Sequence, residues 1–216
     1  MSGYELQPEF FIHDEAALRS LYEPVHALAL QKQRQTLGAN AQDFIRRSPF
    51  LLIGTQGREG RADVSPRGDA AGFVRILDDS TLAIPDRPGN NRLDTLDNIV
   101  ANPSVGLLFL IPGYDETLRV NGRARLTTQP DILESMAVGG RVPKLAIVVQ
   151  IDEVFLHCAK AFRRSHLWDP ASLQDRSEMP SLMKMILDDT TGAPADPEVM
   201  TKMDENLEVA YRQTLY

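Results

Sequence analysis

The sequence predicts a mainly β protein of the α+β class, in which a small antiparallel barrel of at least six strands is flanked by helices at both termini. Three observations predict this fold. Between residues 50 and 155, short apolar or alternating stretches follow one another, and tight turns separate most of them. Residues 93–101 interrupt this series once with apolar residues at helical spacing. The regions before residue 50 and after residue 180 also show helical spacing.

Composition and charge limit the classes of protein to consider. A chain of 216 residues with 43% hydrophobic and 25% charged residues is typical of a globular protein with one large domain or one domain with helical additions. The net charge of −7 argues against binding duplex nucleic acid, which needs a broad basic face. The sequence shows no leader peptide and no apolar run of membrane-spanning length, and Cys158 is the single cysteine. We therefore expect a cytoplasmic protein without a disulfide.

The N-terminal region is predicted to be helical. Apolar residues recur at spacings of three and four in residues 16–22 and 27–37, and a third helix is expected to begin near Asn40 with Phe44 and Ile45 buried. The dipeptide Ser48-Pro49 should end this helix, because the residue before a proline avoids the helical conformation.

Seven stretches of the central region have strand-like patterns: residues 50–55, 61–66, 72–77, 81–85, 104–111, 116–126 and 144–155. Residues 104–111 are almost continuously apolar, which predicts a central strand covered on both faces. Residues 116–126 alternate instead, with Leu118 and Val120 against Arg119 and Asn121. One face of this strand should therefore be exposed to solvent or face a ligand.

The connection from the strand ending at Pro85 into the following helix has the features of a phosphate cradle. It contains a Pro-Gly turn, then Asn90 and Asn91, then Arg92. Either asparagine could cap the helix, and the amides at a helix start favour an anion. Arg87 and Arg92 flank this start with fork-shaped donors suited to phosphate. The alternative is a capped helix with two solvated arginines.

Residues 157–168 concentrate cations, two histidines, Cys158 and the single tryptophan. The spacing of His157, Cys158 and His166 matches none of the common zinc patterns, so no metal site is predicted. A polar linker follows at 170–180, and helices are expected over 182–187 and 197–211.

Several of these motifs together resemble a known family. Residues 63–69 (DVSPRGD), 84–92 (IPDRPGNNR) and 117–122 (TLRVNG) resemble the FMN-binding split-barrel proteins related to pyridoxamine 5′-phosphate oxidase. Residues 157–161 (HCAKA) and 164–168 (RSHLW) fit a subgroup of FMN-dependent enzymes within it. The resemblance covers roughly residues 44–168.

The resemblance, together with the helical patterns on either side of it, gives an organisation for the whole chain. It implies a six-stranded antiparallel split β-barrel at residues 49–168 that binds FMN. Residues 1–48 would be a helical segment packing on the barrel, and residues 169–216 would form a linker and helices. Members of the family are typically homodimers with flavin sites shared between subunits.

The resemblance also assigns roles to matching positions. Ser65 and Arg67 match residues that contact the flavin phosphate and ribityl chain, and Asn91 and Arg92 match the pair that takes the phosphate. The strand whose backbone lies beside the flavin ring corresponds to Ile84, Pro85, Asp86 and Arg87. A phosphate monoester carries nearly two negative charges, and arginine forks, hydroxyls and helix amides replace the water that it loses on binding.

The basic segment after the last strand has two interpretations. In a two-fold dimer it can reach the partner's flavin, where a cation near N1 would stabilise the reduced ring. Lys160 is the first choice for this role and Arg163 the second, because helical spacing places both on one face. The alternative is a solvated basic turn.

The predicted function is therefore that of an FMN-dependent oxidoreductase acting on an unknown small organic substrate. Pyridoxamine phosphate oxidase activity itself is not expected, because the Arg-x-His grouping that follows the tryptophan in those enzymes is replaced by Arg164-Ser165-His166 before Trp168. No nucleophile elbow, HExxH or Walker motif is present, so the sequence lacks the motifs that usually indicate a hydrolase. The alternative is a non-catalytic protein that binds a flavin or a haem-type ligand.

Overall fold

The structure, a computed structural model, describes residues 4–216 and divides into two units that meet between Gln33 and Arg34. The N-terminal unit holds a short 3-10 helix at Pro8–Phe10 and the helices α1 (Glu15–Ser20) and α2 (Ala27–Gln31). Every described residue of this unit is exposed, so it has no core of its own. The prediction that the second helix continues to residue 37 is wrong. Instead, Arg34 pairs with Val154 in a β-bridge that belongs to the second unit.

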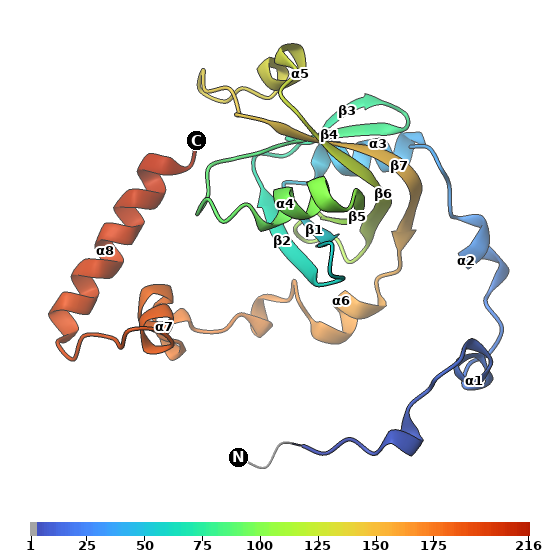
Figure 1. The fold of residues 1–216 in the computed structure, drawn as a ribbon, viewed down its shortest axis with the longest axis horizontal. Coiled ribbons are helices and arrows are strands. Elements are labelled where there is room, and N and C mark those ends of the chain that lie inside the picture. Colours follow the sequence, from blue (N-terminus) through green and yellow to red (C-terminus); the bar gives the residue numbers. More distant parts are fainter. Residues whose placement is uncertain (1–3) are drawn as a thin grey trace. The chain divides into compact units, whose positions relative to one another are not determined.

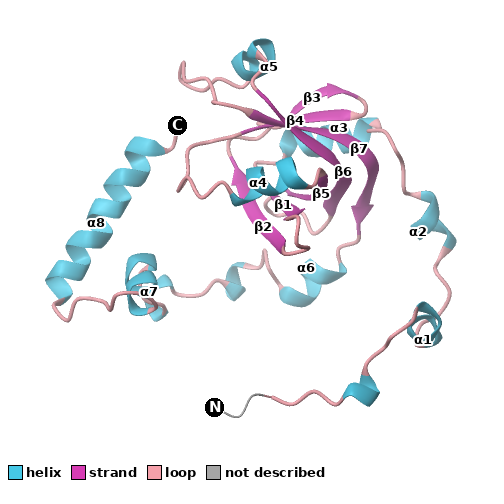
Figure 2. Cartoon of the chain, in the orientation of Figure 1, coloured by secondary structure: helices cyan, strands magenta, loops and turns pink. Residues whose placement is uncertain are grey.

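The second unit is built on one antiparallel sheet (Figures 1 and 2). Its strands are β1 (Phe50–Gln56), β2 (Ala62–Gly68), β3 (Arg75–Asp78), β4 (Thr81–Pro85), β5 (Ser104–Leu110), β6 (Thr117–Thr127) and β7 (Ala146–His157). They lie in the order β2-β1-β5-β6-β7-β4-β3 and leave the sheet open between β2 and β3. The antiparallel split-barrel class is confirmed, with seven strands in place of the six expected.

The helices of this unit are α3 (Ala39–Arg47), α4 (Asp94–Ala101), α5 (Pro130–Ser135), α6 (Lys160–Ser165), α7 (Leu182–Asp188) and α8 (Pro197–Thr214). Two 3-10 helices lie at Pro170–Ser172 and Arg176–Glu178. As expected, α3 ends at the Ser48-Pro49 step and buries Phe44 and Ile45. The division of the chain at residues 48 and 168 stays a prediction.

The core fills the concave side of the sheet. Residues that are paired across the strands share a face, so Leu51 of β1, Phe109 of β5 and Leu118 of β6 form one buried row. Helix α4 packs against β1, β2 and β6 (Figure 1). It buries Leu96 and Ile99, whereas Val100 is 76% exposed.

The convex side of the sheet is less completely covered. Along β5, Val105, Leu107 and Phe109 are buried, but the alternate residues Leu108 and Leu110 are only half-buried. The prediction that this strand is covered on both faces is therefore wrong for the single chain. A row of half-buried side chains runs across this face from Leu52 through Leu108 to Arg119 and Phe155.

The alternation along β6 produces the polar face that was expected. Arg119 Nη2 and Asn121 Nδ2 both donate to Glu153 Oε1 at 2.9 Å, and the Arg119 guanidinium carbon lies 4.3 Å from the centre of the Phe155 ring. Residues 4–216 contain no helix that combines the length and the apolar character needed to cross a membrane.

Candidate functional site

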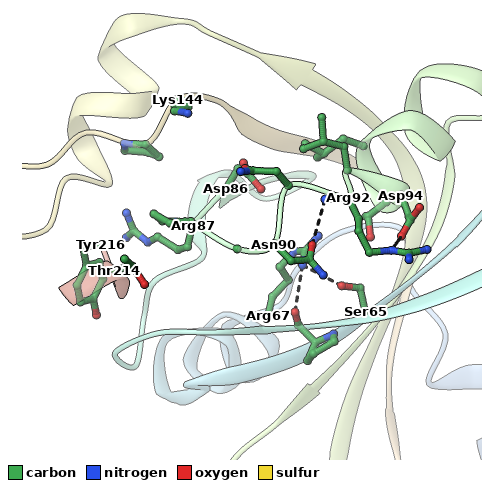
Figure 3. A pocket seen from close by; sticks show the side chains of 18 of the residues that line it. Ser65, Arg67, Asp86, Arg87, Asn90, Arg92, Asp94, Lys144, Thr214 and Tyr216 are labelled. Atoms are coloured by element: carbon green, nitrogen blue, oxygen red, sulfur yellow. Dashed lines mark hydrogen bonds and ion pairs between the residues drawn. The ribbon is translucent and has the colours of Figure 1, made fainter. Parts of the chain in front are cut away.

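A cavity of about 660 Å³ lies where the two ends of the open sheet approach each other (Figure 3). One wall is β2, which is an edge strand, and the facing wall is the segment that leads from β4 into α4. The residues before β7 and after α8 complete the lining. Three carboxylates line the cavity, at Asp63, Asp86 and Asp94. Five cationic side chains also line it: Arg67, Arg87, Arg92, Arg141 and Lys144. The pocket is thus cationic in a chain of net charge −7, which favours an anionic ligand.

The β2 wall presents Ser65 and Arg67. These residues pair with Ile53 and Leu51, so they lie on the concave face, beyond the core. Arg67 Nη1 donates to Ser65 Oγ at 2.9 Å and to the Pro66 carbonyl at 3.1 Å. The Arg67 Nε–H is buried without a hydrogen-bond partner. Burial lowers the pKa of Arg67, although the carboxylates of Asp86 and Asp63 oppose this effect. A ligand with a hydrogen-bond acceptor in the pocket could bond to this Nε–H and so compensate for its burial.

The opposite wall is fixed to the sheet at Asp86, whose amide continues the β4–β7 ladder by donating to the Leu145 carbonyl at 3.0 Å. Burial raises the pKa of the Asp86 carboxyl, and the nearby cations Arg67 and Lys144 only partly offset this. Asp86 therefore holds a proton at a higher pH than an exposed aspartate does.

The start of α4 differs from the predicted capped helix. The helix begins at Asp94, its N-cap is Leu93 in the left-handed conformation, and no side chain caps it. Asn90 Oδ1 instead accepts from the Arg92 amide at 3.1 Å, and Asn91 has a φ of 58°. The prediction that either asparagine caps the helix is wrong, because the turn is tightened at residues 90–93 before the helix begins.

Arg92 lies at the mouth of the pocket and is mostly solvated. Its Nε donates to Asp94 Oδ2 at 2.7 Å, and its side chain is 72% exposed. The hydrogen bond to Asp94 raises the pKa of Arg92. An exposed ion pair of this kind contributes little free energy, so Arg92 remains available to a ligand.

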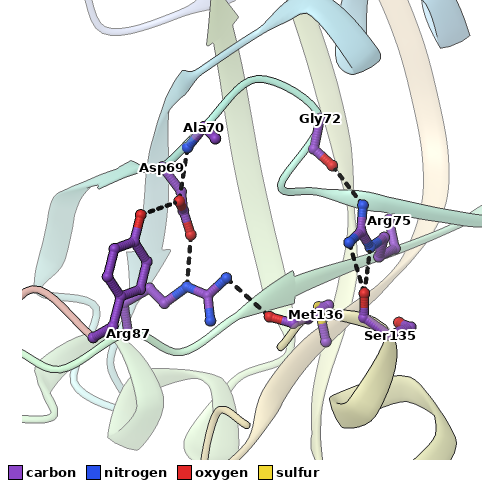
Figure 4. Close-up of polar contacts among 8 residues, drawn as sticks. Asp69, Ala70, Gly72, Arg75, Arg87, Ser135 and Met136 are labelled. Carbon is purple, nitrogen blue, oxygen red and sulfur yellow. Dashed lines mark hydrogen bonds and ion pairs between the residues drawn. The ribbon is translucent and has the colours of Figure 1, made fainter. Parts of the chain in front are cut away.

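Arg87 forms a buried ion pair with Asp69 (Figure 4). The Arg87 Nε to Asp69 Oδ2 distance is 2.7 Å, and the side chains are 17% and 2% exposed. Arg87 Nη2 also donates to the Met136 carbonyl at 3.0 Å. Because Asp69 follows β2 and Arg87 follows β4, the pair ties the two ends of the sheet together across the split.

Asp69 accepts two further hydrogen bonds, both at Oδ1: one from the Ala70 amide and one from the Tyr216 phenol, each at 2.7 Å. Burial on its own would raise the pKa of Asp69, but the hydrogen bonds from Tyr216, Ala70 and Arg87 outweigh it and hold this pKa below the ordinary value of 3.8.

The depressed pKa of Asp69 gives a pH prediction. A carboxylate whose pKa is lower in the folded than in the unfolded state stabilises the fold above its unfolded pKa, and this stabilisation disappears as the pH falls through the folded pKa. We expect the free energy of unfolding to decrease below about pH 3.8 less steeply in Asp69→Asn than in wild type. Urea titrations between pH 2.5 and 6 measure this. Parallel curves for the two proteins would contradict the assignment.

Six of the residues predicted for the site line this one pocket: Ser65, Arg67, Asp86, Arg87, Asn91 and Arg92. Ile84 and Pro85 do not line it, since their side chains are buried in β4, beside the wall. Lys160 and Arg163 lie on α6, outside the pocket of their own chain. Arg163 Nε donates to Asp115 Oδ2 at 3.2 Å. Their predicted role toward a second subunit stays a prediction.

Sequence reasoning missed part of the lining. Arg141 and Lys144 precede β7 and carry no motif, and Thr214 and Tyr216 are far from the other lining residues in sequence. The Arg67-Gly68-Asp69 sequence supplies the pocket cation Arg67 and also Asp69, which is the partner of the pocket cation Arg87. Among the described residues, no three His, Cys, Asp or Glu side chains come together as a metal site.

Comparisons with known proteins agree with this geometry. A model of the family described as pyridoxamine 5′-phosphate oxidase matches residues 37–158, more than half of the chain. The chain belongs to this family. The match includes both walls of the pocket formed by β2 and by the segment after β4, and it ends before α6.

Solved structures give weaker likenesses. HupZ of Group A Streptococcus has a TM-score of 0.47 and 20% identity, over 56% of this chain and 93% of that one. An FMN-binding protein of Syntrophomonas wolfei has a TM-score of 0.42 and 10% identity, over 61% and 91%. A pyridoxamine 5′-phosphate oxidase-related, FMN-binding protein of Nostoc punctiforme has a TM-score of 0.42 and 15% identity, over 57% and 85%. A comparison with curated protein sequences found no match.

Proposed function

We propose that the chain is an FMN-dependent oxidoreductase that acts on a small organic substrate. The observation that carries this proposal is Arg67, a half-buried arginine in a cationic pocket whose buried Nε–H lacks a partner. Membership of the pyridoxamine 5′-phosphate oxidase family supports the choice of FMN as the anion.

The residues of the pocket fit the phosphate of FMN. A phosphate monoester carries about 1.5 to 2 negative charges at pH 7 and presents three strong acceptor oxygens. Arg67 offers its unpaired Nε–H, Ser65 offers a hydroxyl 2.9 Å from the same side chain, and Arg92 is exposed at the mouth. We assign the phosphate to these three residues together with Asn91, which shares the pocket lining.

The rest of the cofactor would lie along the wall formed by Asp86 and Arg87, beside the backbone of Ile84 and Pro85. Flavin supplies the transfer of hydride or electrons when bound, and the protein orients it and adjusts its electrostatic environment. Burial raises the pKa of the Asp86 carboxyl group at this wall. Arg87 is held in one orientation by Asp69 and the Met136 carbonyl, so it presents a fixed positive charge at this wall.

A homodimer is part of the proposal. The half-buried apolar row on the convex face includes Leu52, Leu108 and Phe155, and the continuous apolar run of β5 is typical of a strand covered on both faces. A second copy packed on this face would complete that burial. The same proposal assigns Lys160 and Arg163 of α6 to the flavin bound to the other subunit.

The experiment that tests the proposal is spectroscopic. Purified protein, supplied with FMN if it is isolated without it, should show flavin absorbance, and heating should release FMN rather than FAD. A protein that takes up no FMN at micromolar concentration would refute the proposal.

A further inference from the structure

The end of α8 and the two residues after it, residues 214–216, return to the pocket, where Thr214 and Tyr216 form part of its lining (Figure 3). Tyr216 contacts three other parts of the chain. Its phenol donates to Asp69 Oδ1 at 2.7 Å, and its carbonyl oxygen accepts from Arg141 Nη1. The Arg87 guanidinium carbon lies 5.5 Å from the centre of its ring. These contacts connect the loops after β2, after β4 and before β7.

Tyr216 acts on groups that already define the pocket. Asp69 is a carboxylate with a 2% exposed side chain, and the phenol supplies one of the hydrogen bonds that compensate for its burial. Arg87 is held at Nε by Asp69 and at Nη2 by the Met136 carbonyl, and the tyrosine ring adds a cation–π contact. The orientation of this pocket cation therefore depends in part on Tyr216.

The body of α8 does not explain why the segment lies there. Along α8, only Met200 is buried, and the helix packs chiefly against α7. The contacts that bring the segment to the pocket are those of Tyr216 itself. Tyr216 remains 37% exposed, so the segment is a wall of the pocket that water can reach.

We propose that Tyr216 is a positioning residue of the pocket, and that residues 214–216 form a wall that helps to retain a bound ligand at this end. The second part of this inference rests on the proposed FMN function. Tyr216 fixes Arg87 through Asp69 and closes the end of the pocket that Arg141 and Lys144 also line.

The first arm of the test needs no flavin. Fluorotyrosine placed at position 216 alone should give a ¹⁹F resonance that differs from that of the urea-unfolded chain and that shifts in Asp69→Asn. Circular dichroism checks that Asp69→Asn is folded. A resonance at the unfolded position in the native protein, or one that Asp69→Asn leaves unmoved, would overturn the inference.

The second arm measures the rate of FMN dissociation by stopped-flow fluorescence. We expect Tyr216→Ala to accelerate dissociation at least about tenfold, because it removes the wall and the contacts that fix Arg87. Tyr216→Phe keeps the ring over Arg87 and loses one hydrogen bond to a carboxylate, so about a threefold to tenfold increase is expected.

Tyr211→Ala is the matched control. Tyr211 is a tyrosine of α8 that lies in the groove between α7 and α8, away from the pocket, and this change should leave the rate within about twofold. An unchanged rate in Tyr216→Ala, or an equal increase in Tyr211→Ala, would overturn the inference. A wild-type protein that binds no FMN would instead refute the proposed function, and the first arm alone would then decide whether Tyr216 is docked.

Discussion

Arg67→Ala should weaken FMN binding by about 10- to 100-fold. A hydrogen bond that involves a charged group contributes about 1.5–3 kcal/mol, and a tenfold change in affinity corresponds to about 1.4 kcal/mol. Arg67 is expected to lie near the top of this range, because its Nε–H is buried and has no partner within the protein. Titration of the protein with FMN, followed by quenching of flavin fluorescence, measures the dissociation constant.

Two arginines serve as comparisons. Arg46→Ala should leave FMN affinity unchanged, because Arg46 is exposed on α3, where it donates to Gln42. Arg92→Ala should have a smaller effect than Arg67→Ala, since Arg92 is solvated and paired with Asp94. Equal affinities of Arg67→Ala and Arg46→Ala would show that the phosphate has been assigned to the wrong place.

Gly122→Ala should produce the largest loss of stability of any single methyl group added to the sheet. Gly122 lies opposite a β-bulge in β7, because Asn121 pairs with Glu153 whereas Gly122 pairs with Ile151. A Cβ atom at this position would overlap the Gln150 carbonyl oxygen and would lie 3.0 Å from its carbonyl carbon. The overlapping atoms belong to the backbone, so two strands must separate. We expect a loss of about 3 kcal/mol or more in the free energy of unfolding, measured by urea denaturation.

Gly54→Ala is the matched control within the same sheet. A Cβ atom at Gly54 would lie 3.7 Å from the Gly106 carbonyl oxygen, which is an ordinary van der Waals distance. This variant should change the free energy of unfolding by less than about 1 kcal/mol at the same protein concentration. Similar losses in Gly122→Ala and Gly54→Ala would mean that the bulge does not bring β6 and β7 into such close approach.

Local patterns predicted the sheet well. Strands such as β1, β5 and β6 have the alternation or the apolar runs that strands require, and the structure places them within one or two residues of the expected bounds. Helix α3 was similarly clear, because a proline follows Ser48 and the apolar residues Phe44 and Ile45 lie on one face. These signals depend only on neighbours in the sequence.

Features set by distant contacts were not predictable in this way. The start of α4 has Leu93 with a φ of 62°, and the preceding segment is anchored through the Asp86 amide to Leu145, which lies far along the chain. The role of Arg87 was only partly predicted. It lines the pocket as expected, but its Nε is engaged by Asp69, a partner on another strand connection.

The position of Tyr216 was even less predictable from the sequence, because it depends on a contact between distant residues. Tyr216 reaches Asp69 across 147 positions of sequence, and no pattern in α8 indicates that the chain returns to the pocket there. The convex face of β5 is a different case, because its apolar run predicted burial on both faces while the single chain buries only one. The proposed second subunit would account for that difference.

The central claim is that the pocket recognises the phosphate of FMN through Arg67. The most direct test is to titrate wild type and Arg67→Ala with FMN and with riboflavin, which lacks the phosphate. Wild type should bind FMN at least about 100-fold more tightly than riboflavin, and this preference should fall by about tenfold or more in Arg67→Ala. Equal affinity of wild type for FMN and riboflavin, or a preference that Arg67→Ala leaves unchanged, would contradict the claim.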